Sequence, residues 1–151
     1  MKEILEKYNI INFSAGELMV KCRAPEELFI NIIPTLCILQ KMRSLINIPI
    51  IINSAYRSPE YNRRIRGSRN SLHMQFNAID FRPAAYNSHM LKELYEDILR
   101  GDFLTEIEWK NGIVSIGPDI MGAGLYPGFI HIDTRGLLGR KCPARWRTLK
   151  Y

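Results

Sequence analysis

Apolar residues recur every three or four positions between residues 28 and 46, which predicts an amphipathic helix ending at Asn47. Pro34 has no backbone donor, so we expect it to kink or divide that segment. Nearer the N-terminus, Ser14 followed by Glu17 is a capping-box pattern and predicts a short helix immediately after Ser14. The regularly spaced apolar residues are Leu28, Ile32, Leu36, Leu39, Met42, Leu45 and Ile46.

Three positions have the residues of a helix start. Pro25 suits the first turn of the helix that carries the apolar positions 28–46. The segment 58–60 offers an N-cap serine, a first-turn proline and an acidic residue, and predicts a helix to about Arg66. Ser88 is expected to cap a helix that ends at Gly101. The apolar face of that helix consists of Leu91, Leu94, Tyr95 and Ile98.

Short apolar or alternating runs predict strands in the remainder of the chain. Two of these runs are joined by Asn111-Gly112, a strong hairpin signal. A glycine-rich loop is expected between this hairpin and the last strand. The predicted strands cover residues 48–52, 78–82, 105–110, 113–116 and 129–134.

The order of these elements predicts an α+β fold. Helices come first and antiparallel strands follow, without the alternation of a parallel sheet, so we expect N-terminal helices packed on a small, mostly antiparallel sheet. No repeat or long linker divides the chain, and residues 1–151 are predicted to form a single domain. Cys22, Cys37 and Cys142 form no closely spaced pair, which indicates reduced thiols.

The net charge of +6 favours a polyanionic partner. Basic residues concentrate at 57–69 and 135–150. Nucleic acid and the anionic bacterial cell wall both fit this charge. The chain lacks a helix-turn-helix, an aromatic RNA-binding motif and zinc-finger spacing, so we expect no specific nucleic-acid partner.

No membrane span is expected, because no apolar run reaches about 18 residues. The segment Met1–Lys7 alternates charged and apolar residues and lacks the uninterrupted apolar stretch of a signal peptide. We therefore expect synthesis in the cytoplasm without a recognisable signal peptide. A monomer is the favoured oligomeric state.

Two of the three histidines lie close to an aspartate. His131 and Asp133 share one face of a predicted strand, because side chains alternate along a strand. His73 precedes Asp80 by seven residues, at the end of a loop that leads into another strand. Two imidazoles, one carboxylate and an open position are the ligand set of a catalytic zinc site. Incidental surface polarity or a structural histidine–aspartate hydrogen bond would also account for each pair taken alone.

Three blocks of sequence resemble the M15-type zinc peptidases, and more narrowly the peptidase M15A C-terminal domain. The blocks are residues 53–62 (NSAYRSPEYN), 70–80 and 129–133 (FIHID). Relatives in this group include D-Ala-D-Ala carboxypeptidases and phage endolysin L-alanyl-D-glutamate peptidases, and the hedgehog signalling domain shares the fold. The resemblance runs from about Phe13 to Trp146.

The resemblance implies that His73, Asp80 and His131 hold one Zn²⁺ ion. Arg57 matches an arginine beside the metal that contacts the substrate or the developing oxyanion, although it could also anchor its loop to a carboxylate. Ser71 matches the small polar residue ahead of the first ligand.

Four polar or aromatic residues are expected to contact substrate, line the cleft or lie elsewhere. Ser71 and Tyr126 are expected to contact substrate, and Tyr56 could line the cleft or belong to the core. His89 has neither motif nor partner and is expected at the surface.

The chain departs from the family pattern at two places. Relatives usually have glycine where this chain has Phe76, and a ring there could alter the loop or narrow the cleft. Relatives also carry an acidic residue or histidine two or three positions before the last ligand, as the general base. Here Asp133 is the first choice for that base, although it could instead orient an imidazole. Glu106 and Glu108, on the predicted hairpin, are weaker candidates for the general base.

The predicted function is zinc-dependent cleavage of an amide bond in peptidoglycan stem peptides, by a carboxypeptidase or an endopeptidase. A non-catalytic, zinc-stabilised binding domain of the same fold is the alternative, motivated by the missing base. The expected place of action is the bacterial cell wall, and a lysis enzyme encoded by a phage or prophage would fit the absence of an export signal.

Overall fold

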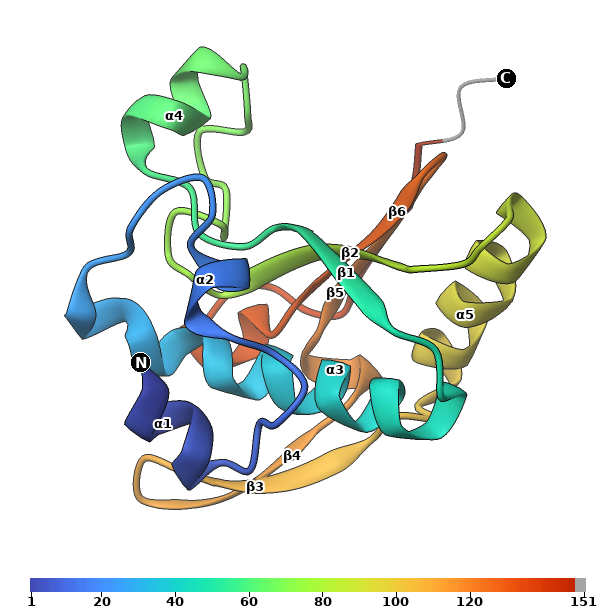
Figure 1. Ribbon diagram of the computed structural model, residues 1–151, viewed down its shortest axis with the longest axis horizontal. Coiled ribbons are helices and arrows are strands. Elements are labelled where there is room, and N and C mark those ends of the chain that lie inside the picture. Colours follow the sequence, from blue (N-terminus) through green and yellow to red (C-terminus); the bar gives the residue numbers. More distant parts are fainter. Residues whose placement is uncertain (149–151) are drawn as a thin grey trace.

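A five-stranded sheet with the order β1-β2-β6-β5-β7 forms the centre of this computed structural model, which describes residues 1–148 (Figure 1). Neighbouring strands run antiparallel, except that β5 and β7 are parallel. The hairpin β3–β4 forms a separate two-stranded sheet. The strands are β1 (Ile50–Ser54), β2 (Ala78–Pro83), β3 (Thr105–Trp109), β4 (Gly112–Ile116), β5 (Gly122–Tyr126), β6 (Phe129–Asp133) and β7 (Ala144–Arg147).

Two long helices pack against these strands. Helix α5 contacts β5 and β6, and α3 contacts the hairpin strand β3. Helix α4 stands away from the rest of the molecule, at the upper left of Figure 1. The architecture confirms the predicted α+β class. The helices are α1 (Lys2–Lys7), α2 (Ala15–Leu18), α3 (Ile33–Ile46), α4 (Pro59–Arg64) and α5 (Ser88–Arg100), with 3-10 turns η1 (Glu26–Ile32), η2 (Pro118–Ile120) and η3 (Arg135–Leu138).

Local signals in the first half of the chain are confirmed. Ser14 and Glu17 form a complete capping box, with the Glu17 amide 3.3 Å from the Ser14 hydroxyl. The apolar segment is divided as Pro34 predicted, into the 3-10 turn η1 and helix α3. Helix α3 ends at Asn47, which adopts a left-handed conformation.

Several boundaries differ from the prediction. Helix α5 is capped by Asn87 rather than Ser88, because the Asn87 side chain accepts from the Met90 amide at 2.8 Å. The hairpin turn is Lys110-Asn111 rather than Asn111-Gly112, since Trp109 pairs with Gly112 and Lys110 takes the positive φ of 55°. Helix α4 ends at Arg64, two residues before the predicted end.

Helix α1, the short 3-10 turns η2 and η3, strand β7, and strand β5, where a glycine-rich loop was expected, were not predicted. Strand β5 has the sequence Gly-Ala-Gly-Leu-Tyr, which is a poor strand former by composition. It is a strand because it lies between β6 and β7 and bonds to both. Pairing with neighbours therefore outweighs local propensity here.

By length and composition, the 21 residues Glu26–Ile46 would suffice to cross a membrane. In the structure this segment is divided in two, and Leu36, Leu39 and Met42 are fully buried in the protein core. A helix with such burial is a core helix. The three cysteines are unpaired, in agreement with the reduced thiols predicted.

The two faces of the central sheet have different chemistry. Ile130 and Ile132 of β6 are fully buried, together with Ile79 and Phe81 of β2. These residues alternate along their strands with His131 and Asp80, whose side chains therefore lie on the other face. The apolar core thus fixes the backbone that carries the polar site.

Candidate metal centre

One row of residues crosses all five strands of the sheet and carries most of the site. Ser54 pairs with Asp80, Asp80 with His131, His131 with Gly124, and Gly124 with Trp146. Residues directly opposite each other on neighbouring strands project to the same face. The register of the sheet therefore places Asp80 beside His131.

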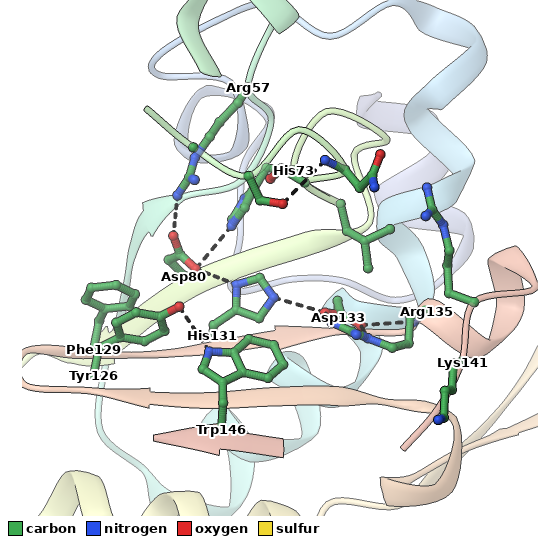
Figure 2. Close-up of a pocket in the computed structure, with 16 residues that line it drawn as sticks. Arg57, His73, Asp80, Tyr126, Phe129, His131, Asp133, Arg135, Lys141 and Trp146 are labelled. Carbon is green, nitrogen blue, oxygen red and sulfur yellow. Dashed lines mark hydrogen bonds and ion pairs between the residues drawn. The ribbon is translucent and has the colours of Figure 1, made fainter. Parts of the chain in front are cut away.

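His73 reaches the same place from the loop before β2 (Figure 2). Its Nε2 lies 3.1 Å from Asp80 Oδ1, and the Nδ1 of His131 lies 2.8 Å from the same oxygen. The donor atoms of His73, Asp80 and His131 all lie within 4.8 Å of one another, the only such group within residues 1–148. The structure thus brings together the three predicted ligands.

The remaining nitrogen of each imidazole has its own partner. His73 Nδ1 lies 2.7 Å from the Ala55 carbonyl and donates to it, so Nε2 is the nitrogen that a metal ion would bind. His131 Nε2 lies 3.0 Å from Asp133 Oδ2, so Nδ1 is the nitrogen of this ring that a metal ion would bind. Both of these nitrogens point at Asp80 Oδ1, and each would exchange its hydrogen bond to that oxygen for a bond to the metal. Two neutral imidazoles with hydrogen-bonded outer nitrogens and one carboxylate fit a zinc ion.

The charges of this cluster are strongly coupled. Burial alone would raise the pKa of Asp80, but hydrogen bonds from His131 and His73 hold that pKa below its usual range. Burial is the main cause that lowers the pKa of His73. For His131 burial also acts to lower the pKa, but its hydrogen bonds to Asp133 and Asp80 outweigh burial and raise it. Asp80 is therefore an anion at neutral pH, as a metal ligand must be.

Arg57 lies beside the three donors. Its guanidinium forms an ion pair with Asp80 Oδ2, and its Nε donates to Ser54 Oγ at 2.9 Å. The Arg57 amide also donates to the His73 carbonyl at 3.1 Å. Arg57 therefore anchors its loop to a carboxylate, the second role considered for it, and contact with the substrate or the oxyanion stays a prediction.

Asp133 is fully buried, and both its oxygens are occupied. Oδ1 accepts from the Gly122 amide at 3.1 Å and from Arg135 Nε at 2.9 Å, and Oδ2 accepts from Arg135 Nη2 at 2.7 Å and faces His131. Burial would raise the pKa of Asp133, but the hydrogen bonds from Arg135 and His131 lower it. A carboxylate with so little proton affinity is poorly suited to be a base. The arrangement favours the second role considered for Asp133, that of orienting His131.

The donor cluster opens into a cleft of about 630 Å³. Ser71 and Tyr126 line this cleft, as the predicted contacts with substrate require. Glu106 and Glu108, the weaker candidates for the general base, lie on the separate hairpin β3–β4 and do not line the cleft.

Two other candidates lie away from the cleft. Tyr56 is buried in the core, and its ring packs edge-on against Phe76. His89 is exposed on α5, with its Nε2 3.3 Å from Glu93 Oε1, at the surface as expected.

Phe76 does not narrow the cleft, so that expectation was wrong. Its ring is fully buried and packs edge-on against Phe29 and Tyr56, with centroids 6.4 and 5.7 Å away. The backbone of Phe76 has a φ of 51°, in the left-handed region that glycine adopts without strain. The turn at Phe76 therefore has a backbone conformation that glycine would also adopt.

Tyr126, Phe129 and Trp146 form an aromatic wall beside the donor cluster. Of these residues, only Tyr126 was predicted from the sequence to belong to the site. The Trp146 ring lies 5.2 Å from that of His131, and its Nε1 donates to the Tyr126 hydroxyl at 3.0 Å. Phe129 stacks on Tyr126 with centroids 4.4 Å apart. A Cβ on Gly124 would lie 2.2 Å from Trp146 Nε1, so only glycine leaves room for this indole. Trp146 enters the site by a parallel pairing across more than twenty residues, which no local pattern reveals.

Arg135 was also missed, although its place two residues after Asp133 was a usable signal. It donates to Asp133 through its side chain and its amide, and its guanidinium lies 5.3 Å from the centroid of the Trp146 ring.

A comparison with known protein families matches residues 11–133 to peptidase M15. A comparison with curated proteins found no match. The matched range covers most of the chain and includes His73, Asp80, His131 and Arg57. The chain therefore belongs to the peptidase M15 family, whose members are zinc-dependent metallopeptidases.

Proposed function

We propose that this peptidase cleaves an amide bond in the stem peptides of bacterial peptidoglycan. The observation that carries the proposal is the convergence of His73, Asp80 and His131 on the floor of an open cleft, with Arg57 beside them. The volume of about 630 Å³ suits a short peptide segment. The aromatic wall and the cationic lining offer contacts to small apolar side chains and to carboxylates.

His73, Asp80 and His131 would hold the zinc ion. Bound zinc supplies an activated water and polarises the scissile carbonyl. Arg57 presents a fixed charge, held by Asp80 and Ser54, where negative charge develops on the carbonyl oxygen. Asp133 keeps the proton of His131 on Nε2, so that the Nδ1 lone pair remains available.

The test is to incubate the purified, zinc-loaded protein with soluble stem peptides and to identify the products by mass spectrometry. We expect one bond to be cut, the activity to disappear with a chelator, and to return with added zinc. His73→Ala should lose both zinc and activity. His89→Ala, at the exposed third histidine, is the matched control and should keep both. A zinc-loaded protein that cuts no bond in any stem peptide would overturn the proposal.

A second candidate is a zinc-stabilised binding domain without turnover. The observation that favours it is that Asp80 and Asp133, the only carboxylates lining the cleft within residues 1–148, are both engaged by hydrogen bonds and ion pairs. Saturable peptide binding by the zinc-loaded protein, with no product after prolonged incubation, would support this candidate. Product formation that depends on zinc would exclude it.

We also propose that the protein acts as a monomer at the cell wall, as a lysis enzyme of a phage or prophage. The cationic lining of the cleft suits an anionic wall polymer. The protein added to isolated walls should release peptide fragments. Isolated walls that release no peptide fragments would contradict this part of the proposal, and light scattering would reveal any dimer.

A further inference from the structure

Two cations that line the cleft have no counter-ion. Arg140 and Lys141 are exposed, and neither forms an ion pair with a carboxylate within residues 1–148. The other two cations of the lining are both neutralised, Arg57 by Asp80 and Arg135 by Asp133. The cleft therefore contains two positive charges that are free to bind an anion.

These two residues lie on a loop whose path is fixed by hydrogen bonds. The Arg140 amide donates to the Arg135 carbonyl at 3.0 Å, and the Ala144 amide donates to the Met121 carbonyl at 3.1 Å. Gly139, just before Arg140, adopts the left-handed conformation that ends the turn η3. These bonds hold the backbone of the loop, so that both side chains start from fixed points at the edge of the cleft.

The cleft is polar at one end and aromatic at the other. Tyr126 and Phe129 lie on one side of His131, and Arg135 and Lys141 lie on the opposite side (Figure 2). A peptide that crosses the donor cluster would extend toward both ends. The cationic end is built from residues after position 133, outside the range matched to the family.

We infer that Arg140 and Lys141 form a carboxylate-binding subsite that selects anionic peptides. The subsite is separate from Arg57, which lies beside the donor cluster and is already paired. Its ligand is a free carboxylate of the substrate that lies away from the scissile amide, such as the free carboxylate of a D-glutamate residue. This inference rests on the proposed function for the identity of the peptide.

The experiment compares two stem peptides that differ only in one group, a free D-glutamate carboxylate or its carboxamide. Binding to the zinc-loaded protein is measured by rapid-mixing tryptophan fluorescence, because Trp146 lies in the cleft. Cleavage is measured as kcat/KM. We expect the wild-type protein to prefer the acid by about tenfold, as two charge-assisted contacts would give. The double variant Arg140→Gln/Lys141→Gln should bind and cleave the acid and the carboxamide equally well. Its zinc content should be unchanged.

The matched control is Arg23→Gln/Lys92→Gln, which removes the same charge at exposed positions outside the cleft. This control should keep the preference for the acid, which separates a local subsite from an effect of net charge. No preference in the wild-type protein, or a preference that survives in the Arg140→Gln/Lys141→Gln variant, would overturn the inference. Preferential binding without cleavage would support the subsite and count against the proposed peptidase activity instead.

Discussion

At the scale of single residues, the role of each polar side chain follows from its hydrogen-bond partners. Asp80 and Asp133 are both buried aspartates, yet they have different surroundings. Asp80 Oδ1 lies against one nitrogen of each imidazole at the open cleft, whereas Asp133 is enclosed by Arg135 and the Gly122 amide. Asp80 is therefore placed to be a ligand, and the surroundings of Asp133 favour a supporting role for it.

Asp133→Asn tests this division of roles. The amide keeps the shape of the side chain but can present an N–H to His131, which disturbs the tautomer with a free Nδ1 lone pair. We expect zinc to bind about 10- to 100-fold more weakly, the usual effect of losing an outer hydrogen bond to a ligand. Competition with a metal-sensitive dye measures this. Asp119→Asn, at an exposed position, is the control. Unchanged zinc affinity together with lost turnover would make Asp133 the general base after all.

Phe76 provides a second test, of stability. Replacing its buried ring by alanine should lower the free energy of unfolding by about 3–5 kcal/mol. Because φ is 51°, glycine should avoid about 1 kcal/mol of backbone strain that alanine retains. Phe76→Gly should therefore be the less destabilised of the two variants in urea unfolding. The reverse order would show that the turn does not need a left-handed residue.

At the scale of secondary-structure elements, the pairing of β5 with its two neighbours determines the back of the cleft. Gly124 stands between His131 and Trp146 in the row across the sheet. Its missing side chain gives the indole a place against the imidazole. Strand β5, whose composition resembles that of a loop, therefore supports the aromatic wall of the cleft.

Gly124→Ala should disturb this wall. The new Cβ would lie 2.2 Å from Trp146 Nε1, so the indole must move, at a cost of about 1–3 kcal/mol in the free energy of unfolding. We expect a lower melting temperature and altered tryptophan fluorescence. Gly112→Ala, where nothing lies within 4 Å of the new Cβ, should change stability by less than about 0.5 kcal/mol. Equal effects of the two substitutions would contradict this account of Gly124.

The sequence allowed prediction of elements with local signals and missed those that depend on distant partners. The capping box at Ser14 and the interruption at Pro34 depend on residues a few positions apart, and both were confirmed. Strand β7 lies parallel to β5, and nothing within Ala144–Arg147 indicates that pairing.

The same distinction applies to the site. His73, Asp80 and His131 could be predicted as ligands because they stand in recognisable blocks of sequence. Trp146 has no such block, and the occupied state of Asp133 could not be predicted without knowing that Gly122 and Arg135 surround it.

At the scale of the whole molecule, the donor cluster and the apolar core are separate. The core joins α3, α5 and the inner face of the sheet, and includes Leu36, Tyr95 and Ile130. The donor cluster lies on the opposite face. We therefore expect the protein to fold without the metal and the metal to stabilise the fold.

Removal of zinc should lower stability without unfolding the protein. Binding to the folded state alone adds about 2.7 kcal/mol at a zinc concentration 100 times the dissociation constant. For a chain of this length we expect the melting temperature to fall by about 5–10 °C with a chelator. Far-UV circular dichroism at room temperature should be unchanged. Loss of that spectrum on chelation would show that zinc is required for folding.

The pairing of Asp80 with His131 across adjacent strands has a consequence for engineering the enzyme. The spacing of these two ligands belongs to the backbone, so it does not depend on the loops that border the cleft. Residues 140 and 141, which line the cleft and lie apart from the three ligands in the chain, can therefore be randomised as an exchangeable border. Libraries built there should yield proteases with new substrate preferences that still take up the ion.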